Sequence, residues 1–155
     1  MTKLSKNFKY REFIKSEIAD KLQICNEPNL TQLNNIQALV DNVLQPVRDL
    51  IDAPITITSG FRSKALNIAI KGSTTSQHCA NNGAAVDIEC FETGNKILFD
   101  LIKNNFNFDQ LIWEFGDENN PDWVHVSYVT ETPNRNQVLK AIKSPNGDTR
   151  YIPFK

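Results

Sequence analysis

The stretch DQLIWEFGDENNPDWVHVSYV, residues 109–129, decides the fold class. Its two ends, DQLIWEF at 109–115 and DWVHVSYV at 122–129, are rich in the β-branched and aromatic residues that favour strands. The loop GDENNP between them consists largely of turn-forming residues. Two strands joined by so short a loop predict an antiparallel pair.

Working outward, ITIT at 55–58 and AAVDIEC at 84–90 predict two further strands, and NQVLKAIK at 136–143 fits either a last strand or a helix. The polar, turn-rich segment 71–83 predicts a loop. Helical patterns cover four segments: residues 10–22, 30–51, 63–70 and 94–104. We expect a kink or break at Pro46, because proline cannot donate a backbone hydrogen bond.

Helices that come mainly first and a sheet that follows predict an α+β fold, with N-terminal helices packed on a small antiparallel sheet. The chain has 155 residues, which is enough to bury a core. We find no internal repeat and no linker rich in Pro, Gly or Ser, so we expect a single domain over residues 1–155.

The charge balance gives no reason to expect nucleic acid or an anionic membrane as a partner. Lys and Arg number 17 against 18 for Asp and Glu. No apolar run reaches the roughly 18 residues of a membrane span, so we expect no membrane insertion. The start MTKLSKNFKYREF lacks the apolar run of a signal peptide, which predicts synthesis in the cytoplasm. We also expect a monomer.

The chain contains only two histidines, His78 in the polar loop and His125 inside a predicted strand. Asp87 lies in the apolar run AAVDI, where an unpaired buried carboxylate would be costly. Two imidazoles and one carboxylate are a ligand set typical of catalytic zinc, with a fourth position left for water. Each residue taken alone also fits an ordinary structural role, so the residue types by themselves leave both interpretations open.

Local motifs favour the interpretation of these three residues as metal ligands. SQHCANNGAAVDI at 76–88 resembles the S-x-H-x-x-G-x-A-x-D signature of the zinc D-alanyl-D-alanine carboxypeptidase and L-alanyl-D-glutamate endopeptidase family, which includes phage endolysins. DWVHVSY at 122–128 resembles the second motif of that family, with an acidic residue three positions before the last histidine. SGFRS at 59–63 resembles its arginine segment. The resemblance covers roughly residues 7–142.

The resemblance implies that His78, Asp87 and His125 bind Zn²⁺ and that Asp122 is the general base. Asp122 stands three residues before His125, and side chains three apart on a strand point to opposite faces. It therefore reaches the pocket only if the backbone bends, and Glu114, at the end of the neighbouring strand, is the next candidate.

The resemblance also implies that Arg62 is a catalytic and substrate-binding residue that holds an oxyanion or a substrate carboxylate. Ser76, which we assign to substrate binding, and Ser127 are candidates to orient the histidines.

The first motif differs from the family pattern, because four residues rather than two separate His78 from Gly83. Two extra residues cost little chain entropy, but they are placed to alter the rim of the cleft. Cys79, beside a proposed ligand, is an alternative fourth ligand, but it would close the position that water needs.

Two other classes compete. A non-haem iron oxygenase also uses two histidines and a carboxylate, but the spacing between His78 and Asp87 is not its H-x-D pattern. A catalytically inactive peptidoglycan-binding or virion domain of the same fold is the non-enzyme alternative. We expect a peptidase that acts on peptidoglycan stem peptides and reaches the cell wall through a holin or with the virion. Carboxypeptidase and endopeptidase action remain equally open.

Overall fold

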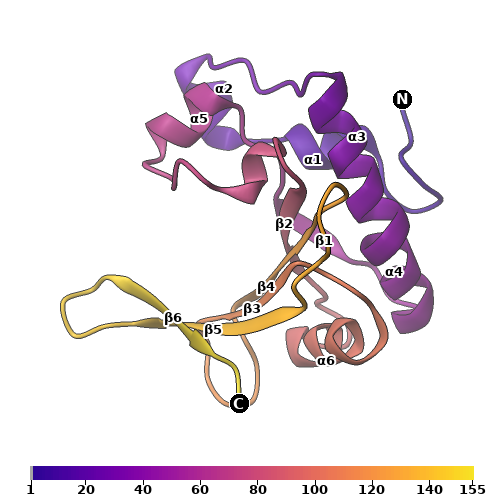
Figure 1. Ribbon diagram of the computed structural model, residues 1–155, viewed down its shortest axis with the longest axis vertical. Helices are drawn as coiled ribbons and strands as arrows, with labels where there is room; N and C mark the ends of the chain where they lie inside the picture. Colours follow the sequence, from indigo (N-terminus) through magenta and orange to yellow (C-terminus); the bar gives the residue numbers. More distant parts are fainter. Residues whose placement is uncertain (1) are drawn as a thin grey trace.

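The computed structural model describes residues 2–155, and Figure 1 shows the arrangement of the helices and strands. The helices are α1 Tyr10–Ile14, α2 Glu17–Leu22, α3 Leu30–Leu39, α4 Gln45–Ile51, α5 Lys64–Ala69 and α6 Asn95–Asn105. A π-helical turn, Val40–Leu44, joins α3 to α4, and a 3₁₀ turn, Gln77–Cys79, precedes the second strand. The strands are β1 Thr56–Ser59, β2 Ala84–Glu89, β3 Gln110–Glu114, β4 Trp123–Tyr128, β5 Gln137–Lys143 and β6 Thr149–Pro153.

These strands form one sheet in the order β1-β2-β4-β3-β5-β6, so the predicted α+β class is confirmed. Neighbouring strands are antiparallel except β3 and β5, which run parallel, whereas the sequence predicts a wholly antiparallel sheet. The chain leaves β4 near the start of β3 and passes to the other side of β3. There Asn136 N–H donates to the Phe108 carbonyl and Gln137 N–H to the Asp109 carbonyl. Because β5 begins beside the start of β3, it runs in the same direction.

Alternation along the strands separates the two faces of the sheet. One face carries apolar side chains that join the core under α3 and α6: Val86, Ile88, Leu111, Trp113, Val124 and Val126. The other face carries Asp87, Ile112, Glu114 and His125, which line an open cavity. In Figure 1 helices α3, α4 and α6 lie on one side of the sheet, while the β5–β6 hairpin extends away from them.

Helix breaks follow local chemistry. The segment predicted as one helix over 10–22 is two helices, because Lys15 and Ser16 are extended and the Ser16 hydroxyl caps α2 by accepting from Ala19 N–H. At Pro46, where the sequence predicts a kink or break, the chain shows an irregularity instead of a break. The π-helical turn ends at Leu44, the backbone stays helical through Gln45, and Pro46, which has no N–H to donate, lies in the first turn of α4. In residues 2–155 no helix is both long and apolar enough to cross a membrane.

Candidate metal centre

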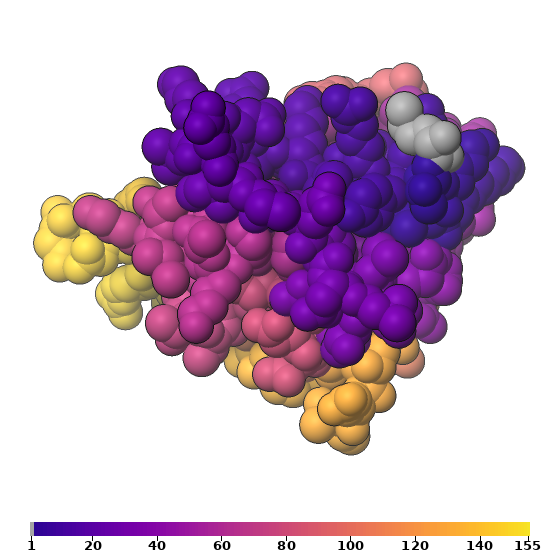
Figure 2. Space-filling model, turned by 90° about the horizontal axis from the view of Figure 1, so that it is seen from above, coloured from indigo at the N-terminus to yellow at the C-terminus, as the bar shows by residue number. Residues whose placement is uncertain are grey.

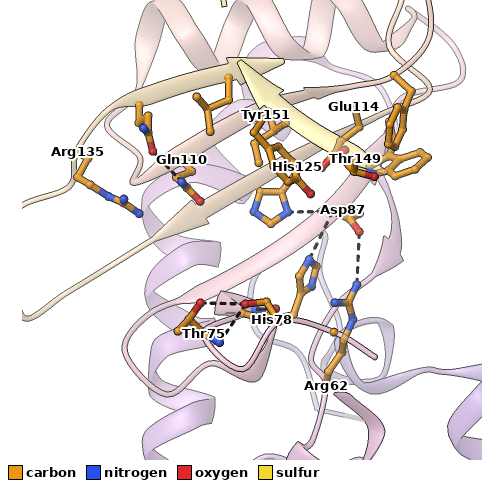
Figure 3. Close-up of a pocket in the computed structure, with 18 of the residues that line it drawn as sticks. Arg62, Thr75, His78, Asp87, Gln110, Glu114, His125, Arg135, Thr149 and Tyr151 are labelled. Carbon is orange, nitrogen blue, oxygen red and sulfur yellow. Dashed lines mark hydrogen bonds and ion pairs between the residues drawn. The ribbon is translucent and has the colours of Figure 1, made fainter. Parts of the chain in front are cut away.

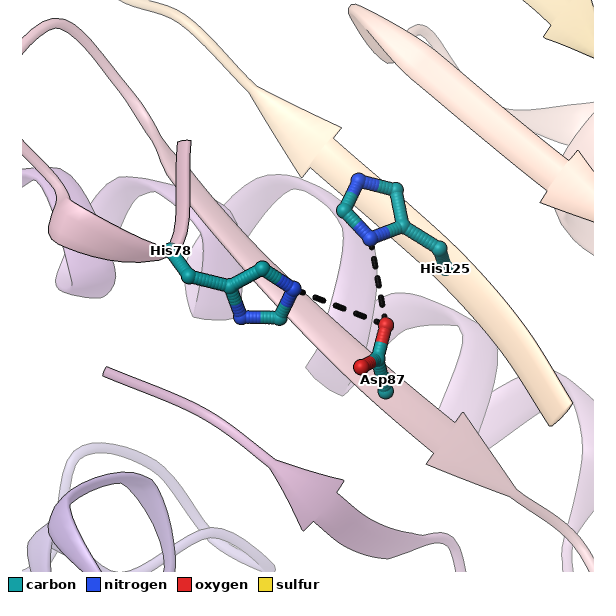
Figure 4. A group of neighbouring side chains, drawn as sticks. All are labelled: His78, Asp87 and His125. Atoms are coloured by element: carbon teal, nitrogen blue, oxygen red, sulfur yellow. Dashed lines mark hydrogen bonds and ion pairs between the residues drawn. The ribbon is translucent and has the colours of Figure 1, made fainter. Parts of the chain in front are cut away.

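Asp87 and His125 face each other across neighbouring strands. β2 and β4 pair with Asp87 directly opposite His125, so both side chains leave the same face of the sheet. His125 Nδ1 lies 3.1 Å from Asp87 Oδ1. Figure 4 shows both imidazoles directed at the same carboxylate oxygen.

His78 reaches the same carboxylate from the 3₁₀ turn. Its Nε2 lies 3.5 Å from Asp87 Oδ1, and only 5% of its side chain is exposed. Its other ring nitrogen, Nδ1, lies 2.8 Å from the Gly60 carbonyl, which can only accept, so Nδ1 carries the proton and Nε2 is free as a ligand. Ser76 Oγ accepts from the His78 backbone N–H, which fixes the turn rather than the ring.

One ligand atom from each of His78, Asp87 and His125 lies within 4.8 Å of the others, so this group is arranged to hold a metal ion. Burial would raise the pKa of Asp87, but the interactions of this carboxylate, led by the hydrogen bond from His125, hold it well below its ordinary value. Burial lowers the pKa of His78, which keeps that imidazole neutral. An ionised carboxylate and a neutral imidazole are the forms that bind a metal.

The SGFR turn after β1 supports His78 from both sides. Gly60 accepts from the ring, and Arg62 N–H donates to the His78 carbonyl at 2.9 Å. A Cβ on Gly60 would lie 2.5 Å from the Phe13 carbonyl oxygen, so only glycine fits without a shift of the backbone. The Arg62 side chain donates from Nη2 to Ser59 Oγ at 3.3 Å and lies 3.9 Å from Asp87 Oδ2.

The three candidate ligands lie in a cavity of about 790 Å³ that Arg62 and Ser76 also line. The loop 72–76 forms one wall, and residues of β5 and β6 form the opposite wall. In Figure 3 Arg62 and His78 lie on one side of Asp87, whereas Glu114 and Tyr151 lie on the other. In Figure 2 the C-terminal segment, in yellow, projects on the same side of the molecule as the magenta segment that carries the loop.

The structure places Glu114 inside the cavity and Asp122 outside its lining. Glu114 is two residues from Ile112, which pairs with His125, so Glu114 and His125 share a face. Only 6% of Glu114 is exposed. Burial raises its pKa to about 7, with Asp87 adding to the shift and His125 opposing it. Asp122 is exposed, and its backbone bonds to Glu114 and to Asn95.

The inserted residues after His78 turn away from the cavity. The Ala80 carbonyl accepts from Asn35, and Asn81 accepts from Gln32, so the insertion packs on α3 instead of forming the rim. Cys79 is buried and lies outside the His78–Asp87–His125 group. Burial raises the pKa of its thiol.

The large aromatic residues of β3 and β4 divide between the core and the cavity. Trp113 belongs to the core and Tyr128 packs against it, whereas Trp123 lines the cavity. Ser127 Oγ accepts from Gln110 N–H, and the ring nitrogens of His78 and His125 that make hydrogen bonds have Gly60 and Asp87 as partners.

Comparison with known proteins gives a family. The Peptidase M15 family matches residues 6–127, which include His78, Asp87 and His125 together with Arg62 and Glu114. No curated protein matches the chain. The match spans well over half of the 155 residues and includes every candidate metal ligand found above. The chain belongs to the Peptidase M15 family.

Proposed function

We propose that this protein is a zinc-dependent peptidase that hydrolyses peptide bonds in the stem peptides of bacterial peptidoglycan. The observation that carries the proposal is the cluster of His78, Asp87 and His125 ligand atoms, within 4.8 Å of one another in an open cavity of a Peptidase M15 chain. The peptidoglycan substrate rests on the motifs in residues 76–88 and 122–128, which resemble those of wall-cutting peptidases. Carboxypeptidase and endopeptidase action both remain possible outcomes of the test.

The donor set fits zinc. His78, Asp87 and His125 would hold zinc through two imidazole nitrogens and one carboxylate oxygen, a set that leaves a ligand position for water, and all three residues line the cavity. When bound there, zinc supplies a Lewis acid and brings the pKa of water to about 7. Of the chain's own residues, Gly60 holds His78 in the ligand tautomer, and the hydrogen bond from His125 leads the interactions that keep Asp87 ionised.

Glu114 is the better candidate for the general base. It is buried in the cavity on the same sheet face as His125, whereas Asp122 is exposed and outside the lining. In this role the Glu114 carboxylate takes a proton from the attacking water and returns it to the nitrogen of the leaving amine. Asp122 could take this role only if the backbone conformation at the start of β4 changed.

Arg62 and Ser76 are proposed to contact the substrate. Arg62 lines the cavity on the His78 side, and its guanidinium makes one hydrogen bond to Ser59 Oγ at 3.3 Å and a long ion pair with Asp87 at 3.9 Å. Stem peptides carry several carboxylates, which a guanidinium binds through two parallel hydrogen bonds. Ser76 lies in the same wall, where its hydroxyl already accepts from His78 N–H and keeps its own proton to donate.

The test combines metal content with product analysis. Elemental analysis of the pure wild type should give about one zinc per chain, and His125→Ala and His78→Ala should each lose most of it. Digestion of purified peptidoglycan by the wild type should release fragments whose masses identify the bond that is cut. Equal zinc in all three proteins would contradict the ligand assignment, and intact peptidoglycan after digestion by zinc-loaded wild type would contradict the substrate.

A further inference from the structure

The β5–β6 hairpin lies beyond the family match, yet it supplies one wall of the metal cavity. The match ends at residue 127, and the hairpin occupies residues 137–153. Its residues in the cavity lining are Gln137, Leu139, Lys143, Thr149 and Tyr151. This wall is therefore a feature of the chain that the family assignment does not explain.

Strand register places Tyr151 in the same row as Glu114. Glu114 pairs with Ala141, and Ala141 pairs with Tyr151, so the three side chains leave one face of the sheet in a line across it. The row that holds Asp87, His125 and Ile112 lies two residues away along the strands, a distance of roughly 6.7 Å. Tyr151 and Glu114 thus both lie on the same side of the candidate metal ligands.

The environment of Tyr151 leaves its hydroxyl available to a ligand. Ala141, between Tyr151 and Glu114, is small and fully buried, so no side chain separates the two. Tyr151 is 55% exposed, and its hydroxyl has no hydrogen-bond partner among residues 2–155. Burial, followed by the charges of Glu114 and Asp87, raises the pKa of the phenol, which stays a donor at neutral pH.

The two walls of the cavity therefore carry different donors. Arg62 lies beside His78 on one side of Asp87, and Tyr151 lies on the other side with Glu114, as Figure 3 shows. A peptide group bound over the metal ligands would present its carbonyl oxygen to one wall. A neutral phenol next to a base can stabilise negative charge on that oxygen and leave the charge of the base unchanged. An ammonium or guanidinium group in the same place would neutralise the base.

We propose that Tyr151 is a further catalytic residue, whose hydroxyl donates a hydrogen bond to the carbonyl oxygen of the scissile peptide as that oxygen becomes negatively charged. This rests on the proposed peptidase function. Water oxygen bonds to the carbonyl carbon, its proton passes to Glu114, and the π-electron pair moves to the oxygen that Tyr151 holds. The carbon–nitrogen bond then breaks as the C=O bond reforms, and the nitrogen takes the proton from Glu114. Tyr151 keeps its proton throughout.

Tyr151→Phe tests the assignment because it removes only the hydroxyl. The matched control is Tyr128→Phe, which loses the same atom from a sheet residue that packs on the core instead of lining the cavity. Steady-state cleavage of a defined muropeptide should show kcat lowered about 10²–10³-fold in Tyr151→Phe, with KM nearly unchanged. Zinc content and the unfolding midpoint should match wild type in both variants.

A second measurement does not depend on turnover. Isothermal titration of the zinc-loaded proteins with a phosphinate analogue of the muropeptide, which imitates the tetrahedral intermediate, should show affinity reduced by a similar factor in Tyr151→Phe alone. Wild-type kcat and analogue affinity in Tyr151→Phe would overturn the inference while the peptidase function stands, and so would a loss confined to KM. A wild type that cleaves no muropeptide would remove the proposed function, and the inference with it.

Discussion

Glu114 and Asp122 differ in where the backbone directs them. Residues two apart on a strand share a face, and residues three apart do not. Ile112 and Glu114 both point into the cavity from the sheet face that carries His125. Asp122 precedes β4, and its side chain is exposed. The motif indicates an acidic residue three before the last histidine, but the strand geometry favours the acidic residue on the neighbouring strand.

A pair of isosteric variants separates the two carboxylates. Glu114→Gln should keep zinc and fold but lower kcat on a defined muropeptide by about 10²–10⁴-fold, since the proton acceptor is gone. Asp122→Asn should retain nearly wild-type kcat, because the exposed carboxylate lies outside the cavity lining. The reverse pattern would assign the base to Asp122 and would require that β4 begins in a different conformation when substrate is bound.

Residue types and motifs were sufficient to predict which residues cluster, but not how each is oriented. His78, Asp87 and His125 were all predicted as one set, and the structure brings them together. The support of the His78 ring by the Gly60 carbonyl could not be predicted, because it joins positions 18 apart through a turn whose shape depends on the contact of Gly60 with Phe13.

At the scale of elements, one buried carboxylate ties three segments together at the start of β3. Asp109, which is 2% exposed, accepts from Arg135 Nε and Nη2 and from the Arg135 backbone N–H. It also accepts from Gln77, the residue before His78. Asp109 therefore links the histidine-bearing turn to the sheet and to the loop that leads into β5.

Asp109→Asn should weaken this connection. We expect the free energy of unfolding to fall by about 1–2 kcal/mol at pH 7, a figure reduced because the Arg135 side chain is solvent-exposed. Hydrogen bonds from Arg135 lower the pKa of Asp109 from 3.8. A lowered carboxyl pKa contributes stability above the unfolded pKa and loses it as the pH falls through the folded value, so the difference from wild type should shrink at pH 3.

Urea unfolding at pH 7 and pH 3 measures the difference. Asp100→Asn is a suitable control, because it removes an exposed carboxylate that pairs with Lys96 within α6 and should change stability by less than about 0.5 kcal/mol. An Asp109→Asn effect no larger than the control at pH 7, or one that grows toward pH 3, would mean that the carboxylate does not hold these segments.

The elements predicted least well are those whose partners lie far along the chain. The strands β1 to β4 follow from alternation and β-branched residues, and the structure contains all of them. The segment TRYIP at 149–153 is not predicted as a strand, because it is short and ends in proline. Its pairing with β5 depends on the turn at 144–148. The parallel β3–β5 pair has no local sequence signal, since the connection through β4 determines it.

For the whole molecule, the order of strands links distant parts of the chain. β1 comes from the first half of the sequence and β2 from just past its middle, and β4 lies between β2 and β3. The candidate ligands come from the turn before β2, from β2 and from β4, so they meet only when the sheet is assembled. We therefore propose that the chain unfolds as one cooperative unit and that metal binding is coupled to that unfolding.

Zinc should raise the unfolding temperature of the whole chain in a single step. A ligand that binds only the native state stabilises it by RT ln(1 + [L]/Kd), about 2.7 kcal/mol at a hundredfold excess over Kd. For a chain of this length that corresponds to an increase in the unfolding temperature of roughly 5–10 °C.

Thermal unfolding with zinc or with a chelator can be followed by circular dichroism and by the fluorescence of Trp113 in the core and Trp123 at the cavity. Both signals should give the same midpoint, and His125→Ala should lose the shift. Two separate transitions would show more than one folding unit, whereas an equal shift in His125→Ala would show that zinc binds elsewhere.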